Sequence, residues 1–383
     1  MTVPATPALV LAGESPLPPT SGVRQRVLHL ARALAAAQPV HLGVLGPPGP
    51  VDGEPFTVTG DGALRPRGAS LRASLRRPYA AARHDAPGLA RLAAQGDWAT
   101  VQAETPWLMA PAVQAGRPVV LDAHNVETDF MRSLTRAESR PAHKLRWAWE
   151  AAKTERWERA ASAAAAAVCV TGEHEAARFE ELGAREVVVV PNGVDVRAVP
   201  FSPRATGARF VYVGHFGYRP NALAALELAG EVLPLVRASV PQASLALVGR
   251  EPDPDVRRLT GPNVEVTGEV ADLAPYLRSA RATIIPLRTG AGTRLKVLEA
   301  MAAGVPIVST PFGVEGIDVR DGEHVLLAET PRELAAAAAR LAVDDALCRA
   351  LAERARRLAE ARYDWRAVGA PLVALHARLG AAA

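Results

Sequence analysis

Short apolar runs alternate with helical segments along almost the whole chain, and this alternation restricts the fold more than any other feature. The runs from Pro7 to Ala12, from Pro118 to Asp122 and from Ala282 to Pro286 are almost wholly apolar, which is typical of strands buried on both faces of a sheet. Strands that alternate with helices indicate parallel sheets with right-handed crossovers. The sequence therefore predicts an α/β protein.

The alternation falls into two blocks separated by residues 196–207, a stretch that contains two prolines and a glycine and is typical of a linker. We expect residues 1–195 and 208–362 to form two facing Rossmann-like domains, each built around a parallel sheet. The last segment, 363–383, is expected to form a helix that crosses back to the N-terminal domain. The cleft between two such domains is the default ligand site. Within the first block, the Pro/Gly-rich residues 47–62 predict a loop.

A glycine loop connects a strand to the following helix at three places, around Gly22, Gly214 and Gly290–Gly292. This order leaves free backbone N–H groups and the positive end of a helix at the carboxyl edge of the sheet, where an anion binds readily. Gly22 by itself is also explained by a tight turn. Neither G-x-G-x-x-G nor the Walker A pattern occurs in these loops, which excludes a dinucleotide fingerprint and a P-loop.

Two cations stand at the start of the helix predicted from Thr293 to Ala303, namely Arg294 and Lys296. Helix starts favour acidic residues because of the helix dipole, so two cations there indicate a bound anion. The chain has only three lysines among its 44 basic residues, so a lysine at this position favours a specific role over a chance surface charge. Arg219, in the second glycine loop, is placed to meet the same anion. Glu299, one turn into the helix, could accept hydrogen bonds from sugar hydroxyls.

No constellation in the sequence indicates a metal or a nucleophile. The patterns H-E-x-x-H and G-x-S-x-G do not occur, and the two cysteines, Cys169 and Cys348, lack metal-ligand spacing. A net charge of +4 is too small to indicate nucleic acid binding. Residues 1–10 lack the features of a signal peptide, and no apolar stretch is long enough to span a bilayer. We therefore expect a cytoplasmic protein that uses no metal or cofactor and binds no nucleic acid.

His124 follows the strand predicted from Pro118 to Asp122 and so lies at the carboxyl end of a buried parallel strand. Sheets of this kind bind their ligands at that edge. A single histidine beside an apolar strand can also be a core residue whose hydrogen bonds are satisfied. Its position in the predicted sheet favours a functional role.

A basic stretch runs from Leu64 to His84. A solvated surface is the simple interpretation, and the alternative is peripheral contact with an anionic membrane at the inner face, or with a phosphate-linked acceptor. The arginines of this stretch are Arg65, Arg67, Arg72, Arg76, Arg77 and Arg83. The long helix predicted from Pro141 to Ala163 carries three tryptophans, which we expect to pack inside the protein rather than to anchor it in lipid; they are Trp147, Trp149 and Trp157.

Three motifs in this sequence resemble motifs of the retaining GT-B glycosyltransferases of the "group 1" (family 4-like) family. The segment from Thr293 to Thr310 resembles the donor-binding block of that family. The segment Gly214–Asn221 resembles the loop that opens the donor domain, and Val190–Asp195 resembles the pattern that closes the acceptor domain. The resemblance covers nearly the whole chain and is strongest from Phe210 to Ile317.

The resemblance implies a GT-B fold and transfer of a sugar from a nucleoside-diphosphate sugar to a glycan or lipid-linked acceptor, with retention of configuration, in cell-surface polysaccharide or glycolipid synthesis. It implies no bound metal and no cofactor. The residues that it implies for catalysis are His124, Arg294, Lys296 and Glu299. The residues that it implies for donor binding are Gly22, Gly214, Arg219, Asn221, Gly268, Gly292, Thr293 and Leu295.

The sequence departs from the family at two positions. Ala291 stands where the first acid of the E-x7-E pattern is expected, with Glu299 as the second acid. His215 replaces the arginine that is common in the first donor loop, and Arg219 is the nearest cation to the lysine of that loop. Two further functions therefore stay open, a sugar-nucleotide epimerase on the same fold and a non-catalytic subunit that binds a sugar nucleotide or glycan.

Overall fold

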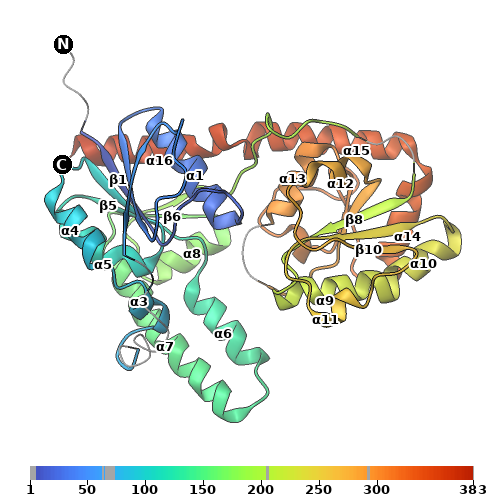
Figure 1. Ribbon diagram of the computed structural model, residues 1–383, viewed down its shortest axis with the longest axis horizontal. Coiled ribbons are helices and arrows are strands. Elements are labelled where there is room, and N and C mark those ends of the chain that lie inside the picture. The colour runs from blue at the N-terminus through green and yellow to red at the C-terminus, as the bar shows by residue number, and fades with distance from the viewer. Residues whose placement is uncertain (1–5, 63, 65–73, 204–206, 291–293, 383) are drawn as a thin grey trace. The chain divides into compact units, whose positions relative to one another are not determined.

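The computed structural model describes residues 6–62, 64, 74–203, 207–290 and 294–382. The chain divides into two compact units (Figure 1). Unit 1 comprises residues 1–192 together with 365–383, and unit 2 comprises residues 193–364. The C-terminal helix thus belongs to the N-terminal unit, which confirms the crossing helix expected from the sequence.

Unit 1 is built around a seven-stranded parallel sheet with the order β3-β2-β1-β4-β5-β6-β7. Its strands are β1 (Ala8–Ala12), β2 (Val40–Leu45), β3 (Thr57–Asp61), β4 (Thr100–Ala103), β5 (Val119–Asp122), β6 (Ala167–Val170) and β7 (Val187–Val189). The central strands are buried along their whole length, as their apolar sequences predict.

The helices of unit 1 are α1 (Gly22–Ala35), α3 (Tyr79–Arg83), α4 (Pro87–Gln95), α5 (Met109–Ala112), α6 (Glu127–Ala137), α7 (Pro141–Ala164), α8 (Glu173–Glu181) and α16 (Trp365–Ala381). Short 3-10 turns, Pro106–Leu108 and Val113–Ala115, flank α5. Helix α16 packs beside α1 in one apolar cluster that contains Val27, Trp365 and Leu372. A Cβ at Gly369 would lie 2.5 Å from the Cβ of Ala33, so a glycine is needed where the two helices approach.

The prediction of a loop over residues 47–62 was wrong in its last part, because Thr57–Asp61 forms strand β3. This strand pairs in parallel with β2 from His41 to Leu45. Its sequence has no apolar run, and most of its side chains are exposed or half-buried. Backbone pairing at the edge of the sheet, rather than burial, makes this segment a strand, and apolar patterning cannot detect that.

Unit 2 has a six-stranded parallel sheet with the order β10-β9-β8-β11-β12-β13. Its strands are β8 (Arg209–Val213), β9 (Ser244–Val248), β10 (Val264–Val266), β11 (Ala282–Ile285), β12 (Ile307–Ser309) and β13 (Leu326–Leu327). Its helices are α9 (Arg219–Glu227), α10 (Leu233–Ser239), α11 (Pro254–Arg257), α12 (Ala274–Ser279), α13 (Leu295–Ala303), α14 (Pro331–Val343) and α15 (Asp345–Leu358). Single π-helical turns, Leu228–Val232 and Ala359–Tyr363, extend α9 and α15, and a 3-10 turn forms at Phe312–Val314.

The division between the units falls after Asn192, a few residues before the linker expected at 196–207. Val194, just before that linker, and Val196, its first residue, are held within unit 2. The N–H of Val194 donates to the carbonyl of Tyr363 at 2.8 Å, and the guanidinium of Arg356 donates to the carbonyl of Val196 at 2.8 Å. The proline and glycine residues therefore indicate that two units are joined in this region. They do not give the exact residue at which one unit ends and the next begins.

Both units thus have the α/β architecture with a parallel sheet that the sequence predicts. Each unit has its own apolar core: one cluster in unit 2, and one on each face of the sheet in unit 1. Among the described residues, no helix is both long enough and apolar enough to cross a membrane.

Candidate active site

The strand order of unit 2 reverses between β8 and β11, which are neighbours in the sheet. In open parallel sheets, ligands bind at the carboxyl ends of the strands at such a switch point. The loop after β8 begins with Gly214, and the loop after β11 contains Gly290 with a φ of +125°. Two of the predicted glycine loops therefore lie at the same edge of the sheet.

A third loop, after β9, packs directly against the Gly214 loop. A Cβ at Gly249 would lie 1.7 Å from the carbonyl oxygen of Gly214, so only glycine allows this approach. The N–H of Gly214 donates to the carbonyl of Val248 at 3.0 Å. His215 and Glu251 join the same two loops, with 2.8 Å between Nε2 and Oε2, and Glu251 has a positive φ of 53°. His215, which replaces the expected arginine, is thus a link between loops.

Lys296 lies in the first turn of α13, and its side chain reaches to strand β8 and helix α9. Its Nζ donates to the hydroxyl of Tyr212 at 3.0 Å and to Oδ1 of Asn221 at 2.9 Å. It also lies 4.2 Å from the centre of the Tyr212 ring. These contacts use two of the three N–H groups of the ammonium. They hold the charge at the switch point, where the third N–H can meet an anion.

Burial lowers the pKa of Lys296 to about 7, with the nearby Arg294 guanidinium as a second cause and the Glu299 carboxylate opposing both. Near neutral pH the lysine is therefore poised between its charged and neutral forms. An anion bound beside it would favour the charged form.

Arg294 immediately precedes α13 and is buried. Its Nε donates to the carbonyl of Phe312 at 3.2 Å, and its guanidinium lies 4.6 Å from the centre of the Phe312 ring. Burial lowers its pKa below the ordinary arginine value. The helix has no side-chain N-cap and no acidic residue in its first turn, so the helix start is positive in character. Arg294 and Lys296 are therefore brought together there, as the sequence predicts.

The other residues of unit 2 that the sequence suggested for the donor site differ in their exposure and in their hydrogen bonds. Arg219 is exposed at the first residue of α9, and Leu295 and Glu299 are half-buried on α13. The side chain of Asn221 is engaged within unit 2, because its Oδ1 also accepts from Tyr212 at 2.8 Å and its Nδ2 donates to the carbonyl of His215 at 3.0 Å. Asn221 thus braces Lys296 and the β8 loop. Three positions lie outside the described residues: Ala291, Gly292 and Thr293.

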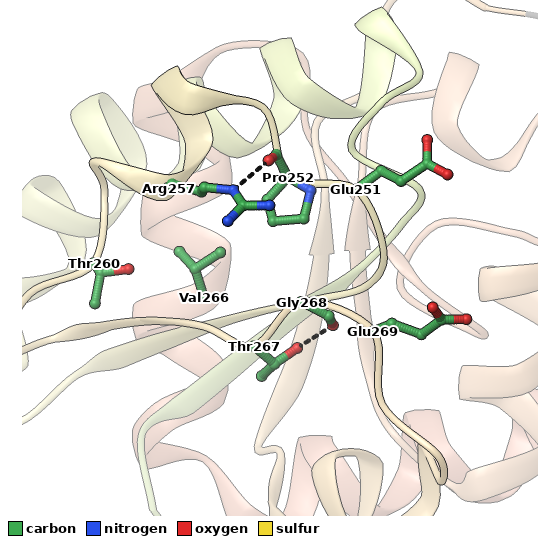
Figure 2. Close-up of a pocket in the computed structure, with 8 residues that line it drawn as sticks. All are labelled: Glu251, Pro252, Arg257, Thr260, Val266, Thr267, Gly268 and Glu269. Carbon is green, nitrogen blue, oxygen red and sulfur yellow. Dashed lines mark hydrogen bonds between the residues drawn. The ribbon is translucent and has the colours of Figure 1, made fainter.

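A pocket of about 340 Å³ lies beyond the carboxyl ends of β9 and β10 (Figure 2). The residues that line it are Glu251, Pro252, Arg257, Thr260, Val266, Thr267, Gly268 and Glu269. Arg257 Nε donates to the carbonyl of Pro252 at 2.8 Å, and the Thr267 hydroxyl donates to the carbonyl of Gly268 at 2.7 Å (Figure 2). The volume falls in the range of small-molecule sites. Gly268, with a φ of +72°, therefore lies on a cavity at the same edge of the sheet as Gly214.

In unit 1 the strand order reverses between β1 and β4. Helix α1 follows β1 and begins at Gly22, with Ser21 as its N-cap: Oγ of Ser21 accepts from the N–H of Arg24 at 3.3 Å. The amides of Gly22 and Val23 therefore lie at the free end of a 14-residue helix, at the carboxyl edge of the sheet.

His124 follows β5 at the same edge and stands in a network of buried charges. Its Nε2 lies 3.0 Å from Oε2 of Glu104 and 3.4 Å from Oδ2 of Asp122. Asp122 in turn accepts two hydrogen bonds from Arg26, at 2.6 and 2.8 Å, and both side chains of that pair are fully buried. The imidazole is therefore fixed by two carboxylates that act on one nitrogen.

This network determines the protonation of its members. The hydrogen bonds and charges of Asp122 and Glu104 outweigh burial and raise the pKa of His124 to about 9, so the ring is an imidazolium at neutral pH. The Arg26 guanidinium holds the pKa of Asp122 well below its ordinary value despite burial. Burial and the charge of Asp122 raise the pKa of Glu104. With Nε2–H turned to the carboxylates, His124 keeps Nδ1–H as a second donor.

The network continues beneath Glu104 to the C-terminal helix. Nε2 of Gln102 donates to Oε1 of Glu104 at 2.6 Å, and the ring of His376 lies 2.9 Å from Oε1 of Gln102 and 2.7 Å from the hydroxyl of Thr100. Burial lowers the pKa of His376 to about 4, so this histidine is neutral. Helix α16 therefore supports the side chain that orients His124.

Glu104, Asp122 and His124 offer three metal-ligating atoms that lie within 4.8 Å of one another. Both oxygens of Asp122, however, already accept from the Arg26 guanidinium. A divalent cation at this point would lie beside a fully buried positive charge, without solvent to screen the repulsion. The chemistry of this donor set therefore fits a charged hydrogen-bond network better than a metal centre.

Sequence reasoning missed four of these residues, Tyr212, Glu104, Asp122 and Arg26. Signals for three of them were present. Glu104 directly follows the buried strand β4, Asp122 ends the apolar strand β5, and Arg26 stands on the apolar face of α1 among buried residues. A charged residue in such a position needs a buried partner. Tyr212 gave no signal, since a tyrosine is ordinary in a core strand.

Sequence profiles of two families match the chain. The profile described as Glycosyltransferase Family 4 matches residues 20–198, and the profile described as Glycosyl transferases group 1 matches residues 207–344. Among curated proteins, phosphatidyl-myo-inositol mannosyltransferase of Mycobacterium leprae is 29% identical over 211 residues, which are 52% of this chain and 55% of that protein. Glycogen synthase of Mycobacterium tuberculosis is 30% identical over 204 residues, or 49% of this chain and 47% of that protein. The chain thus spans about half the length of the curated relatives that it matches.

Solved structures of similar fold include sucrose-phosphate synthase from Thermosynechococcus elongatus, which is 21% identical with a TM-score of 0.74 over 99% of this chain and 100% of that chain. Anabaena HepE, solved in complex with UDP and glucose, is 16% identical with a TM-score of 0.68 over 96% and 99% of the two chains. These likenesses show that the fold is GT-B. With one family profile on each unit and a GT-B fold overall, the chain belongs to the group 1, family 4-like glycosyltransferases.

Proposed function

We propose that this protein transfers a sugar from a nucleoside-diphosphate sugar to a glycan or lipid-linked acceptor, with retention of the anomeric configuration. The observation that carries the proposal is the pair of cations at the start of α13, Arg294 and Lys296, placed where two glycine loops meet at a switch point. Family membership supports it, as do the relatives named as a mannosyltransferase and a glycogen synthase, and the relative solved with UDP and glucose.

The proposed donor site has three parts. The diphosphate lies at the start of α13, where it receives the third N–H of Lys296 and the free amides of the helix. The nucleoside base lies toward the pocket that contains Gly268, along the same edge of the sheet. The carboxylate of Glu299, one turn into the helix, accepts from the ribose hydroxyls.

Bond cleavage leaves negative charge on the diphosphate and positive charge on the sugar ring. Cations that are already held in place stabilise that leaving group without reorganisation in the transition state. The departing phosphate oxygen takes the proton of the acceptor hydroxyl, so no protein base is required. His124, held as an imidazolium, acts as a fixed donor to the reacting sugar and not as a base. Cell-surface polysaccharide or glycolipid synthesis is the corresponding process.

The decisive experiment is incubation of the protein with labelled nucleotide sugars and a lipid-linked glycan extract. Transfer with retained configuration, determined by NMR of the product, supports the proposal. Isomerised donor without transfer would indicate an epimerase, and binding without turnover would indicate a non-catalytic subunit. A thermal-shift screen of nucleoside diphosphates identifies the base first, because a bound ligand raises the midpoint of unfolding.

Turnover is expected to survive a chelator. Lys296 and Arg294 supply the positive charge that a metal would otherwise supply, and Arg26 occupies the carboxylate of the one candidate ligand cluster among the described residues. Initial rates with and without EDTA should agree within about twofold. Loss of turnover in EDTA that returns with Mg²⁺ or Mn²⁺ would contradict this expectation.

Binding of a nucleoside diphosphate is expected to weaken as pH rises above 7. Lys296 has a pKa of about 7 in the free protein and binds the anion in its protonated form. Above pH 7 the protein must take up a proton on binding, so Kd rises by up to about tenfold per pH unit. Calorimetry from pH 6.5 to 9 measures Kd and, in two buffers of different ionisation enthalpy, proton uptake. A Kd that is independent of pH over this range would exclude this role for Lys296.

A further inference from the structure

Helices α6 and α7 form a hairpin whose connecting end lies away from the sheet of unit 1 (Figure 1). The C-terminal half of α7 is anchored, with Glu158, Ala161 and Ser162 buried. Oxygens of Glu158 accept the N–H groups of Glu127 and Thr128 at 2.7 and 2.8 Å and so cap the start of α6. The first part of α7 is different, since residues 141–146 are all exposed.

Large apolar side chains are exposed on this free end. Leu145 is 73% exposed and Trp149 is 48% exposed. Being four residues apart, they lie on one face of the helix. The expectation that the tryptophans pack inside the protein is wrong for Trp149, although Trp157 does pack, with Nε1 donating to the carbonyl of Pro106 at 2.8 Å.

The segment after the undescribed residues 65–73 adds to the same surface. Nζ of Lys153 donates to the carbonyl of Ser74 at 2.5 Å and lies 3.9 Å from the centre of the Trp149 ring. The N–H of Tyr79 donates to Glu150. These contacts hold Leu75, which is 65% exposed, beside α7. We call the six exposed residues of this region the arm surface: Leu75, Arg76, Lys144, Leu145, Arg146 and Trp149.

The arm surface is positively charged. Among the described residues, no carboxylate forms an ion pair with Arg76, Lys144 or Arg146. The nearby acids are engaged with other cations: Glu150 pairs with Lys153 at 2.6 Å, and Glu138 with Arg140 at 3.1 Å. The surface therefore presents three cations around exposed leucine and tryptophan side chains.

Of the six arginines that the sequence suggested for membrane contact, one is exposed and forms no ion pair among the described residues. Arg76 is exposed, whereas Arg77 pairs with Asp85 at 3.1 Å and Arg83 is half-buried with a partner of its own. Three lie outside the described residues: Arg65, Arg67 and Arg72.

We infer that the arm surface docks on an anionic phospholipid bilayer. Tryptophan and leucine side chains favour the interface between headgroups and acyl chains, and cations around them meet lipid phosphates. Each basic residue near an anionic surface adds about fivefold to partitioning, so three cations distinguish anionic from neutral lipid strongly. Bilayer binding does not depend on the proposed transferase activity, and it would bring the protein to lipid-linked acceptors.

The test is co-sedimentation of the full chain with vesicles of phosphatidylcholine alone or with about 30% phosphatidylglycerol. We expect binding to the anionic vesicles only, weakened by salt. The double variant Leu145→Ser/Trp149→Ser and the double variant Lys144→Glu/Arg146→Glu should each lower partitioning at least about tenfold. The matched control is Val343→Ser/Arg278→Glu, which changes an exposed valine and an exposed arginine of unit 2.

Circular dichroism melts establish that each variant is folded. Equal partitioning of wild type and both arm variants would overturn the inference, as would loss of binding in the control alone. If the wild type does not bind vesicles and sedimentation velocity shows a dimer that Trp149→Ser dissociates, the arm surface is an interface between copies of this chain and the inference fails. Binding of glycan to the arm surface without vesicle binding would overturn it as well.

Discussion

Replacing Lys296 by methionine is expected to weaken binding of the preferred nucleoside diphosphate by about 30- to 1,000-fold, because removal of one charged partner of a buried ion contact costs about 2–4 kcal/mol. The third N–H of the ammonium is the group that meets the diphosphate, and methionine keeps the length of the side chain without its charge. The loss should appear in Kd measured by calorimetry at pH 6.5, where Lys296 is protonated in the wild type.

The same substitution is not expected to destabilise the free protein. The hydroxyl of Tyr212 still donates to Oδ1 of Asn221 at 2.8 Å when the lysine is gone. Burial holds the pKa of Lys296 at about 7, below its ordinary value of 10.5, so folding releases a proton from the lysine between these pH values. The wild type accordingly gains stability as pH rises from 7 to 10.5, and Lys296→Met loses this dependence.

Lys144→Met is the matched control, since Lys144 is an exposed lysine on α7 of unit 1. It should leave both Kd and the melting temperature unchanged. Weak binding by Lys296→Met together with a fallen melting temperature would indicate a structural role. Unchanged binding would remove the diphosphate site from the start of α13 and, with it, the main support for the proposed function.

Replacing His124 by alanine is expected to lower kcat about 100-fold or more, the cost typical of removing one preorganised donor from an active site. The affinity for the nucleoside diphosphate should stay close to that of the wild type, because the diphosphate contacts lie in unit 2. His174→Ala, an exposed histidine of α8, is the matched control. A kcat within twofold of the wild type would show that His124 is only a satisfied core histidine.

The pH profile distinguishes a donor from a base. His124 has a pKa of about 9, so an imidazolium donor supports turnover below pH 9 and fails above it. In Glu104→Gln the hydrogen-bonded carboxylate is lost, the pKa of His124 falls, and the alkaline limb of kcat should move to lower pH. Asp122 and Glu127 also face the ring and remain in this variant. A kcat that rises through pH 9 would mean that neutral His124 acts as a base.

These profiles are measured at saturating donor, so that the titration of Lys296 near pH 7 affects donor binding and not kcat. Glu104→Gln keeps the shape of the side chain and can still bond to Gln102, so a change confined to the pH profile marks Glu104 as a positioning residue. A general loss of kcat without a shift of the limb would indicate that Glu104 only supports the fold.

The predictions from local patterns agree with the structure where burial and backbone geometry decide the fold. The apolar run from Ala282 to Pro286 contains a strand, Ala282–Ile285, that is buried along its whole length. A strand that is covered on both faces of a sheet must be apolar on both sides, so an unbroken apolar run predicts it. The helix expected from Thr293 begins at Leu295, with Arg294 as its N-cap residue. Strand β3 was missed because an edge strand of mixed polarity has no apolar period.

The sequence by itself predicted the two α/β units and the glycine loops, because these depend on the spacing of apolar residues and on glycine at strand ends. It also indicated Arg294, Lys296 and His124 as candidate site residues. The two cations stand where a helix dipole disfavours them, and the histidine follows a buried strand. Only the tertiary structure decided the protonation of the site. Burial lowers the pKa of Lys296 to about 7, and the carboxylates of Asp122 and Glu104 raise the pKa of His124 to about 9, although Glu104 lies 20 residues away in the sequence. A pKa depends on distance and desolvation, and these quantities exist only once the strands are placed side by side.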